Sequence, residues 1–302
     1  MLVESSDKTK LFYLVVLSLA GSFILGFAAV IPELIAPGIS SHINYLRISI
    51  LLQDIFVLSL PAYLVFRWSY AKPVQQLGFV KHKLIGNWLF YTLLLFLVSS
   101  PAISVLAQWN EQLVFPESLK KIEVWFRQME DAALQVTDRF LSGTTYFELL
   151  LNVIVVAAFA ALAEEIFFRG ALQQLLKGWF KNGHFAVWIA AFVFSAIHLQ
   201  FYGFIPRLLM GAVLGYLFLF TGNIWVPVFY HFVNNASVVI SKFYWSDTKL
   251  FEQMQDLDLN WKSYLVMVLS LIFTIYLLKR LKQLSKTTIP RKRMEGEQLS
   301  DN

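Results

Sequence analysis

Eight apolar stretches constrain the fold of this chain more than any other feature of its sequence. A transmembrane helix needs about 20 mostly apolar residues, because the hydrocarbon core of a bilayer is about 30 Å thick and each helical residue rises about 1.5 Å. Stretches of this kind lie at roughly 11–32, 47–67, 86–107, 146–177, 185–200, 206–221, 223–243 and 261–280. We therefore predict an all-α fold, a polytopic helix bundle with about eight transmembrane helices in a lipid bilayer.

The composition supports this class and excludes others. Hydrophobic residues make up 57% of the chain and charged residues 15%, whereas soluble domains carry about 45–50% and about 25%. These proportions exclude an intrinsically disordered chain and disfavour an ordinary soluble enzyme. The sequence has no cysteine, which excludes disulfides, zinc–thiolate sites and cysteine nucleophiles.

Basic residues are distributed unevenly over the loops. They are concentrated in 68–85, in 177–184 and in the tail after residue 278, whereas 108–145 and 244–260 carry many acidic residues. Basic loops remain in the cytosol under the positive-inside rule. With eight spans, the pattern predicts that both termini are cytosolic, in what we expect to be the plasma membrane.

The connection between the third and fourth stretches carries an apolar residue at every third or fourth position. These residues are Leu119, Ile122, Phe126, Met129, Ala133, Val136 and Phe140. The opposite face is charged, which predicts an amphipathic helix. Such a helix either lies in the outer membrane interface or forms a small soluble cap on the bundle. The polar tail from about residue 285 is predicted to be disordered.

Three charged residues, Glu164, Glu165 and Arg169, interrupt the interior of the fourth apolar stretch. Placing an ionisable group at the centre of a membrane helix costs roughly 2.5–3.5 kcal/mol even on a lenient scale, so each needs a reason. Glu165 and Arg169 are four residues apart on one helix face, in the order that favours an ion pair. Glu164 points about 100° away from Glu165, which leaves its carboxylate for another task.

Two histidines and an asparagine follow in later stretches. His198 lies at the end of the fifth stretch, and the seventh contains His231 and Asn235 on one helix face. Two histidines, an asparagine and a spare glutamate on three membrane helices indicate a shared site. Counted from the cytosolic boundaries, Glu164 and both histidines lie about 12–20 Å below the inner surface. We expect them to meet in one cavity open to the cytosol.

These side chains match the requirements of peptide-bond hydrolysis. A glutamate beside a histidine can deprotonate a water as a general base, and His231 with Asn235 can donate hydrogen bonds to the oxyanion. Alternatively, Glu164, His198 and His231 can bind zinc, because one glutamate and two histidines form a known catalytic ligand set. The HExxH spacing is missing, and the sequence does not decide between metal-free and zinc-assisted chemistry. Zinc is therefore the one candidate cofactor.

Three motifs in this order resemble those of the CPBP family of intramembrane proteases, the CAAX-processing and bacteriocin-processing enzymes also called the ABI or Rce1-like family. The motifs are Glu164-Glu165-xxx-Arg169, Phe194-xxx-His198 and His231-xxx-Asn235. The resemblance implies that Glu164 with His198 activates water and that His231 with Asn235 stabilises the oxyanion. It further implies that Glu165, Arg169 and Phe194 support the site.

On this basis we divide the chain into three parts. Residues 1–145 hold the N-terminal transmembrane helices and the external amphipathic segment, 146–243 the CPBP-type catalytic core, and 244–302 an external loop, the last span and the basic tail. The predicted activity is intramembrane hydrolysis of a membrane-associated protein or peptide, with no nucleic-acid partner. Two alternatives stay open: a non-catalytic scaffold or bacteriocin-immunity protein of the same fold, and a proton-coupled transporter with proline-interrupted helices.

Overall fold

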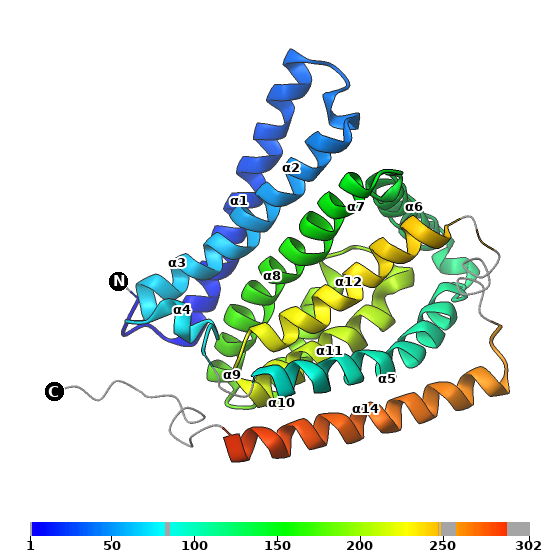
Figure 1. Cartoon of the computed structure of the whole chain (residues 1–302). Helices are drawn as coiled ribbons and strands as arrows, with labels where there is room; N and C mark the ends of the chain where they lie inside the picture. The colour runs from blue at the N-terminus through cyan, green and yellow to red at the C-terminus, as the bar shows by residue number, and fades with distance from the viewer. Residues whose placement is uncertain (1, 82–84, 247, 249–257, 289–302) are drawn as a thin grey trace.

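The structure is a computed structural model that describes residues 2–81, 85–246, 248 and 258–288. Every regular element in these ranges is a helix, which confirms the predicted all-α bundle (Figure 1). The last helix continues to Thr288, and the rest of the tail predicted to be disordered lies outside the described residues.

The α-helices are α1 (Asp7–Ile35), α2 (Ile43–Gln53), α3 (Leu60–Ser69), α4 (Pro73–Gln76), α5 (Ile85–Glu111), α6 (Lys120–Leu141), α7 (Tyr146–Asn152), α8 (Ala160–Glu165), α9 (Gln174–Phe180), α10 (Gly183–Ala196), α11 (Phe204–Thr221), α12 (Trp225–Trp245) and α14 (Trp261–Thr288). Three π-helical segments are η2 (Asp54–Ser59), η4 (Val153–Phe159) and η5 (Ile166–Gln173). Short 3₁₀ turns are η1 (Ile39–Ser41), η3 (Glu117–Leu119) and η6 (Phe201–Gly203).

Six of the predicted spans are long and apolar enough to cross a bilayer, as judged over the described residues. They are Asp7–Ile35, Ile43–Ser69, Ile85–Glu111, Tyr146–Phe180, Phe201–Thr221 and Trp261–Ser285. The two other predicted spans are present as helices that do not meet this standard. Helix α10 has only 14 residues, and polar residues occupy the middle of α12. Helix α10 carries Phe194 of the second motif, and α12 carries the third motif.

The first described residues, the end of the last helix and the basic loops all lie at one end of the bundle. The Leu2 N–H donates to the Trp68 carbonyl at 2.9 Å, and the Ile224 N–H donates to the Gly78 carbonyl at 2.9 Å. Near the end of α14, the Lys282 Nζ lies 5.3 Å from the centroid of the Phe220 ring. The start of α1, the ends of α3, α11 and α14, and the start of α12 therefore lie together, as an even number of crossings requires (Figure 1).

Helix α11 packs tightly on α10 and η5 through two glycines. A Cβ atom at Gly215 would lie 2.8 Å from Val187 Cγ1 and 2.9 Å from Gln173 Oε1. The carbonyls of Gly211 and Gly215 accept hydrogen bonds from Arg169 Nη2 and Gln173 Nε2, both at 3.0 Å. Small residues four apart allow this close approach between membrane helices.

The substitution Gly215→Ala is therefore expected to lower the free energy of unfolding by about 1–3 kcal/mol, because the added methyl overpacks the contact with α10. The matched control is Gly26→Ala in α1, where a Cβ would meet no atom within 4 Å. That control is expected to raise stability by about 0.5–1 kcal/mol, since alanine favours a helix interior over glycine. Denaturant titration of the detergent-solubilised protein measures both changes, and an equal effect at the two positions would contradict the packing argument.

Candidate active site

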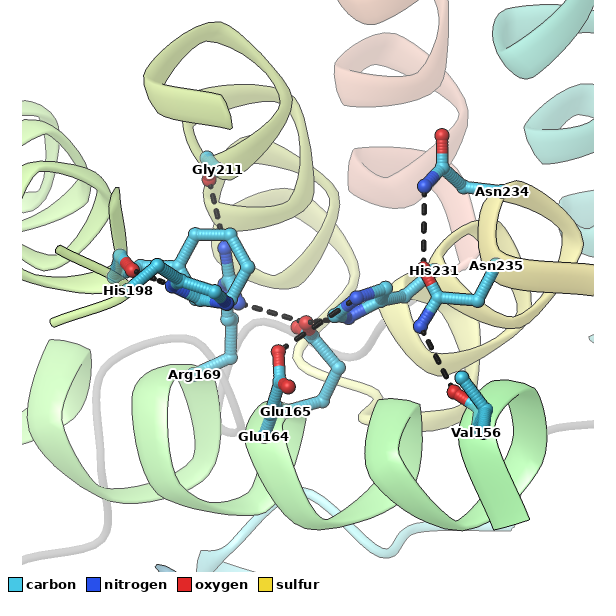
Figure 2. Close-up of polar contacts among 10 residues, drawn as sticks. Val156, Glu164, Glu165, Arg169, His198, Gly211, His231, Asn234 and Asn235 are labelled. Atoms are coloured by element: carbon cyan, nitrogen blue, oxygen red, sulfur yellow. Dashed lines mark hydrogen bonds and ion pairs between the residues drawn. The ribbon is translucent and has the colours of Figure 1, made fainter. Parts of the chain in front are cut away.

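The predicted ion pair between Glu165 and Arg169 is present and deeply buried. Arg169 Nη1 donates to Glu165 Oε1 at 2.7 Å, and the two side chains are 1% and 0% exposed. Arg169 Nη2 reaches across to the carbonyl of Gly211 on α11 (Figure 2). The pair thus locks the helix of the first motif against α11.

His231 lies between the two glutamates of the first motif. Its Nδ1 is 2.9 Å from Glu165 Oε1, and its Nε2 is 3.7 Å from Glu164 Oε2. Glu165 Oε1 therefore accepts hydrogen bonds from both Arg169 and His231. One buried carboxylate orients an arginine and a histidine from two different helices, as the convergence of dashed lines in Figure 2 shows.

Glu164 differs from its neighbour in exposure and in partners. Its side chain is 18% exposed, while that of Glu165 is inaccessible. Within the described part of the chain, Glu164 Oε2 has no hydrogen-bond partner. A buried polar atom without a partner calls for an explanation, and a catalytic role is one of the recognised ones.

His198 sits just beyond the end of α10, on the opposite side of the Glu164–His231 pair from Asn235 in Figure 2. Its Nδ1 is 2.7 Å from the Phe194 carbonyl oxygen. Because a carbonyl can only accept, Nδ1 carries the proton, and a neutral His198 presents Nε2 as an acceptor. The Phe194 ring packs edge-on against both histidine rings, at centroid distances of 5.2 and 5.8 Å.

The contacts of His198 and Asn235 differ from those expected. Glu164 is close enough to His198 to act on its charge, but among the described residues the direct partner of Glu164 is His231. Asn235 Nδ2 donates to the Val156 carbonyl at 3.4 Å, and its Oδ1 accepts from Asn234. The sequence predicted both residues at one site; it did not predict these partners.

The predicted zinc ligands are Glu164, His198 and His231. In the ranges that the structure describes, no three His, Cys, Asp or Glu side chains are grouped to hold a metal ion. His231 instead has each ring nitrogen directed at a carboxylate. The residues as placed do not fit zinc, and we derive no step through it.

Two charged residues near the site lie outside the three motifs. Asp54 on η2 is buried and within electrostatic range of Glu164, and its Oδ2 has no hydrogen-bond partner among the residues that the structure describes. Arg207 on α11 is within range of both Glu164 and His198. Its Nη2 donates to Gln200 Oε1 at 2.7 Å. A single arginine inside an apolar stretch was the available sequence signal for Arg207, and sequence reasoning did not use it.

Comparison with known proteins supports the family resemblance. Residues 146–237 match the family model described as type II CAAX prenyl endopeptidase Rce1-like, which confirms the predicted resemblance. The chain is 32% identical over 89 residues to the Bacillus subtilis (strain 168) protein named "Uncharacterized protein YpbD". The match covers 28% of this chain and 42% of that relative, so the chain aligns with less than half of the relative's length. No solved structure matches the chain.

Proposed function

We propose that this chain, a CPBP-family protein by its match over residues 146–237, is an intramembrane endopeptidase that hydrolyses a peptide bond of a membrane-associated protein or peptide. The observation that carries the proposal is the environment of Glu164. This partly exposed carboxylate faces His231 across 3.7 Å, beside a neighbour whose charge is already neutralised by Arg169. A general base must be able to reach the water that it deprotonates, and the partial exposure of Glu164 allows this, whereas the inaccessible Glu165 is paired with Arg169.

In the proposed mechanism, Glu164 takes a proton from a substrate water. The water oxygen bonds to the carbonyl carbon, the C–N bond breaks, and the proton passes to the leaving nitrogen. His198 offers Nε2 as a second acceptor that orients the water, and Glu165 holds His231 in place through Nδ1. Asn235 uses one of its two Nδ2 N–H donors on the Val156 carbonyl, and the second N–H is the one that would donate to the oxyanion.

The proposed substrate approaches within the membrane. An apolar groove between α5 and α12 is lined by Ile85, Leu89, Trp225, Val228, Phe229 and Phe232. Phe232 directly follows His231 on α12, so an apolar segment in this groove would run along the helix that carries His231. We further propose that the chain is located in the plasma membrane, with its termini and the cavity on the cytosolic side, since the basic loops gather at one end of the bundle.

The test compares membrane proteomes of cells that carry the intact chain or the variant Glu164→Gln. We expect cleavage products that accumulate only with the intact chain, because the amide cannot accept the proton from water. The matched control is Glu117→Gln, the same change at an exposed glutamate of η3. Control cells are expected to show the same products as cells with the intact chain.

A second measurement separates loss of chemistry from loss of protein. The melting temperature of purified Glu164→Gln is expected to equal that of the intact chain, since the buried Glu164 Oε2 has no hydrogen-bond partner among the described residues. Unchanged products in Glu164→Gln cells, with the variant folded, would contradict the protease and favour the scaffold.

A further inference from the structure

His198 is held on a turn instead of a helix. Helix α10 ends at Ala196, and α11 begins at Phe204, after η6. Leu199, the residue after His198, has a φ of 54°, in the left-handed region that side chains other than glycine rarely adopt. Such a conformation persists only when the surroundings hold it, so the direction of the His198 ring depends on what fixes this turn.

The turn is fixed by polar side chains of α5 and α6. Asn110 Nδ2 donates to the Phe201 carbonyl at 3.0 Å, while its Oδ1 accepts from the Ile205 N–H at 2.8 Å. Glu130 Oε2 accepts from the Tyr202 N–H at 3.1 Å. Helices α5 and α6 both lie before residue 146, outside the segment that matches the family model.

Glu130 also controls the side chains next to His198. Its Oε1 accepts from Gln200 Nε2 at 3.3 Å, and Gln200 Oε1 accepts from Arg207 Nη2 at 2.7 Å. Burial raises the pKa of Glu130, while the Tyr202 N–H and the charges of Arg207 and Arg127 act against this shift. The Glu130 carboxylate thus begins a hydrogen-bond network that runs from α6 through Gln200 to Arg207. Arg207 is within electrostatic range of Glu164.

Aromatic contacts dock the same part of α6 on the turn. The Arg127 guanidinium lies 3.4 Å from the Tyr202 ring centroid, and the Phe126 and Phe201 rings stack at 4.8 Å. These contacts keep α6 in place without Glu130. Removing the carboxylate is therefore expected to loosen the turn while leaving the helix docked.

We propose that Glu130 is a positioning residue for His198: by accepting the Tyr202 N–H and the Gln200 amide, it fixes the turn that holds His198 within electrostatic range of Glu164. The catalytic consequence rests on the proposed function; the structural consequence does not. Helix α6, which the sequence indicated only as an amphipathic segment, thereby becomes part of the active site.

The test uses the full chain in detergent, with Glu130→Ala, the conservative Glu130→Gln and the neighbouring control Asp131→Asn. Asp131 is exposed on the same helix. In Glu130→Ala we expect amide hydrogen exchange at residues 199–205 to rise about 10- to 100-fold, as loss of hydrogen bonds to a charged group predicts. Carbethoxylation of His198 by diethyl pyrocarbonate is expected to accelerate, with His184 unchanged as the internal reference. Glu130→Gln retains an acceptor and is expected to stay close to the intact chain, as is Asp131→Asn.

An activity measurement then tests whether Glu130 affects catalysis. Its substrate is the membrane protein whose cleavage products the comparison with Glu164→Gln identifies. Glu130→Ala is expected to lower kcat with little change in KM, because the substrate groove is untouched, and Glu130→Gln is expected to restore most of it. Unchanged exchange and unchanged modification of His198 in Glu130→Ala would overturn the proposal. A loosened turn with unchanged kcat would overturn the catalytic role. A failure of the protease assignment itself would show separately, as unchanged products in Glu164→Gln cells.

Discussion

Replacing Arg169 by methionine is expected to lower the free energy of unfolding by about 3–5 kcal/mol, because it leaves the Glu165 carboxylate buried without its counter-charge. Glu165 is inaccessible to solvent, so water cannot take the place of the guanidinium. The substitution also removes the hydrogen bond to the Gly211 carbonyl and with it one tie between η5 and α11. Denaturant unfolding of the detergent-solubilised protein measures the loss.

Two further variants separate the charge from the side-chain volume. Arg139→Met removes an arginine from the exposed face of α6 and is expected to change stability by less than about 0.5 kcal/mol. In the double variant Glu165→Gln/Arg169→Met no uncompensated charge remains, and we expect it to be more stable than Arg169→Met alone. If the double variant were the less stable of the two, the buried charge would not be the cause of the loss.

The same ion pair shows what the sequence could predict. The spacing of Glu165 and Arg169 is local, four residues along one helix, and the structure contains the pair. The membrane helices could be predicted equally well, because each needs only a continuous apolar stretch in the sequence. Six of the eight stand alone as membrane spans among the described residues. The other two are α10 and α12. Helix α10 ends before His198 and is too short, and α12 has polar site residues in its middle.

The partners of the site residues could not be predicted, because they depend on how distant helices pack. His231 and Glu165 are 66 residues apart, and no local pattern indicates that one carboxylate serves both His231 and Arg169. The π-helical segments η2, η4 and η5 also lack a sequence signal that we recognised, although such segments are frequent at functional sites. For α6, the apolar stripe located the helix, whereas the contact that connects it to His198 is made by the polar Glu130.

The substitution His231→Ala is expected to lower the rate of cleavage about 10²- to 10⁴-fold, the range in which loss of a general acid–base partner falls. His231 is the described residue that contacts both Glu164 and Glu165, so its removal frees the proposed base from its orienting neighbour. Product formation in membranes measures the rate, and a melting curve verifies that the variant is folded. The control His184→Ala changes a histidine whose partner is Tyr216, remote from the motifs, and is expected to leave the rate unchanged.

The double variant Glu164→Gln/His231→Ala distinguishes one catalytic unit from two independent contributions. If the 3.7 Å contact between the two side chains holds the reacting water, removing either partner already destroys the unit. The double variant should then be no slower than the slower single variant, because groups that act together are strongly non-additive. If the rate reductions of the two single variants instead multiply in the double variant, His231 acts independently of Glu164. In that case His198, whose Nε2 is the other acceptor near the site, would be the partner of the base.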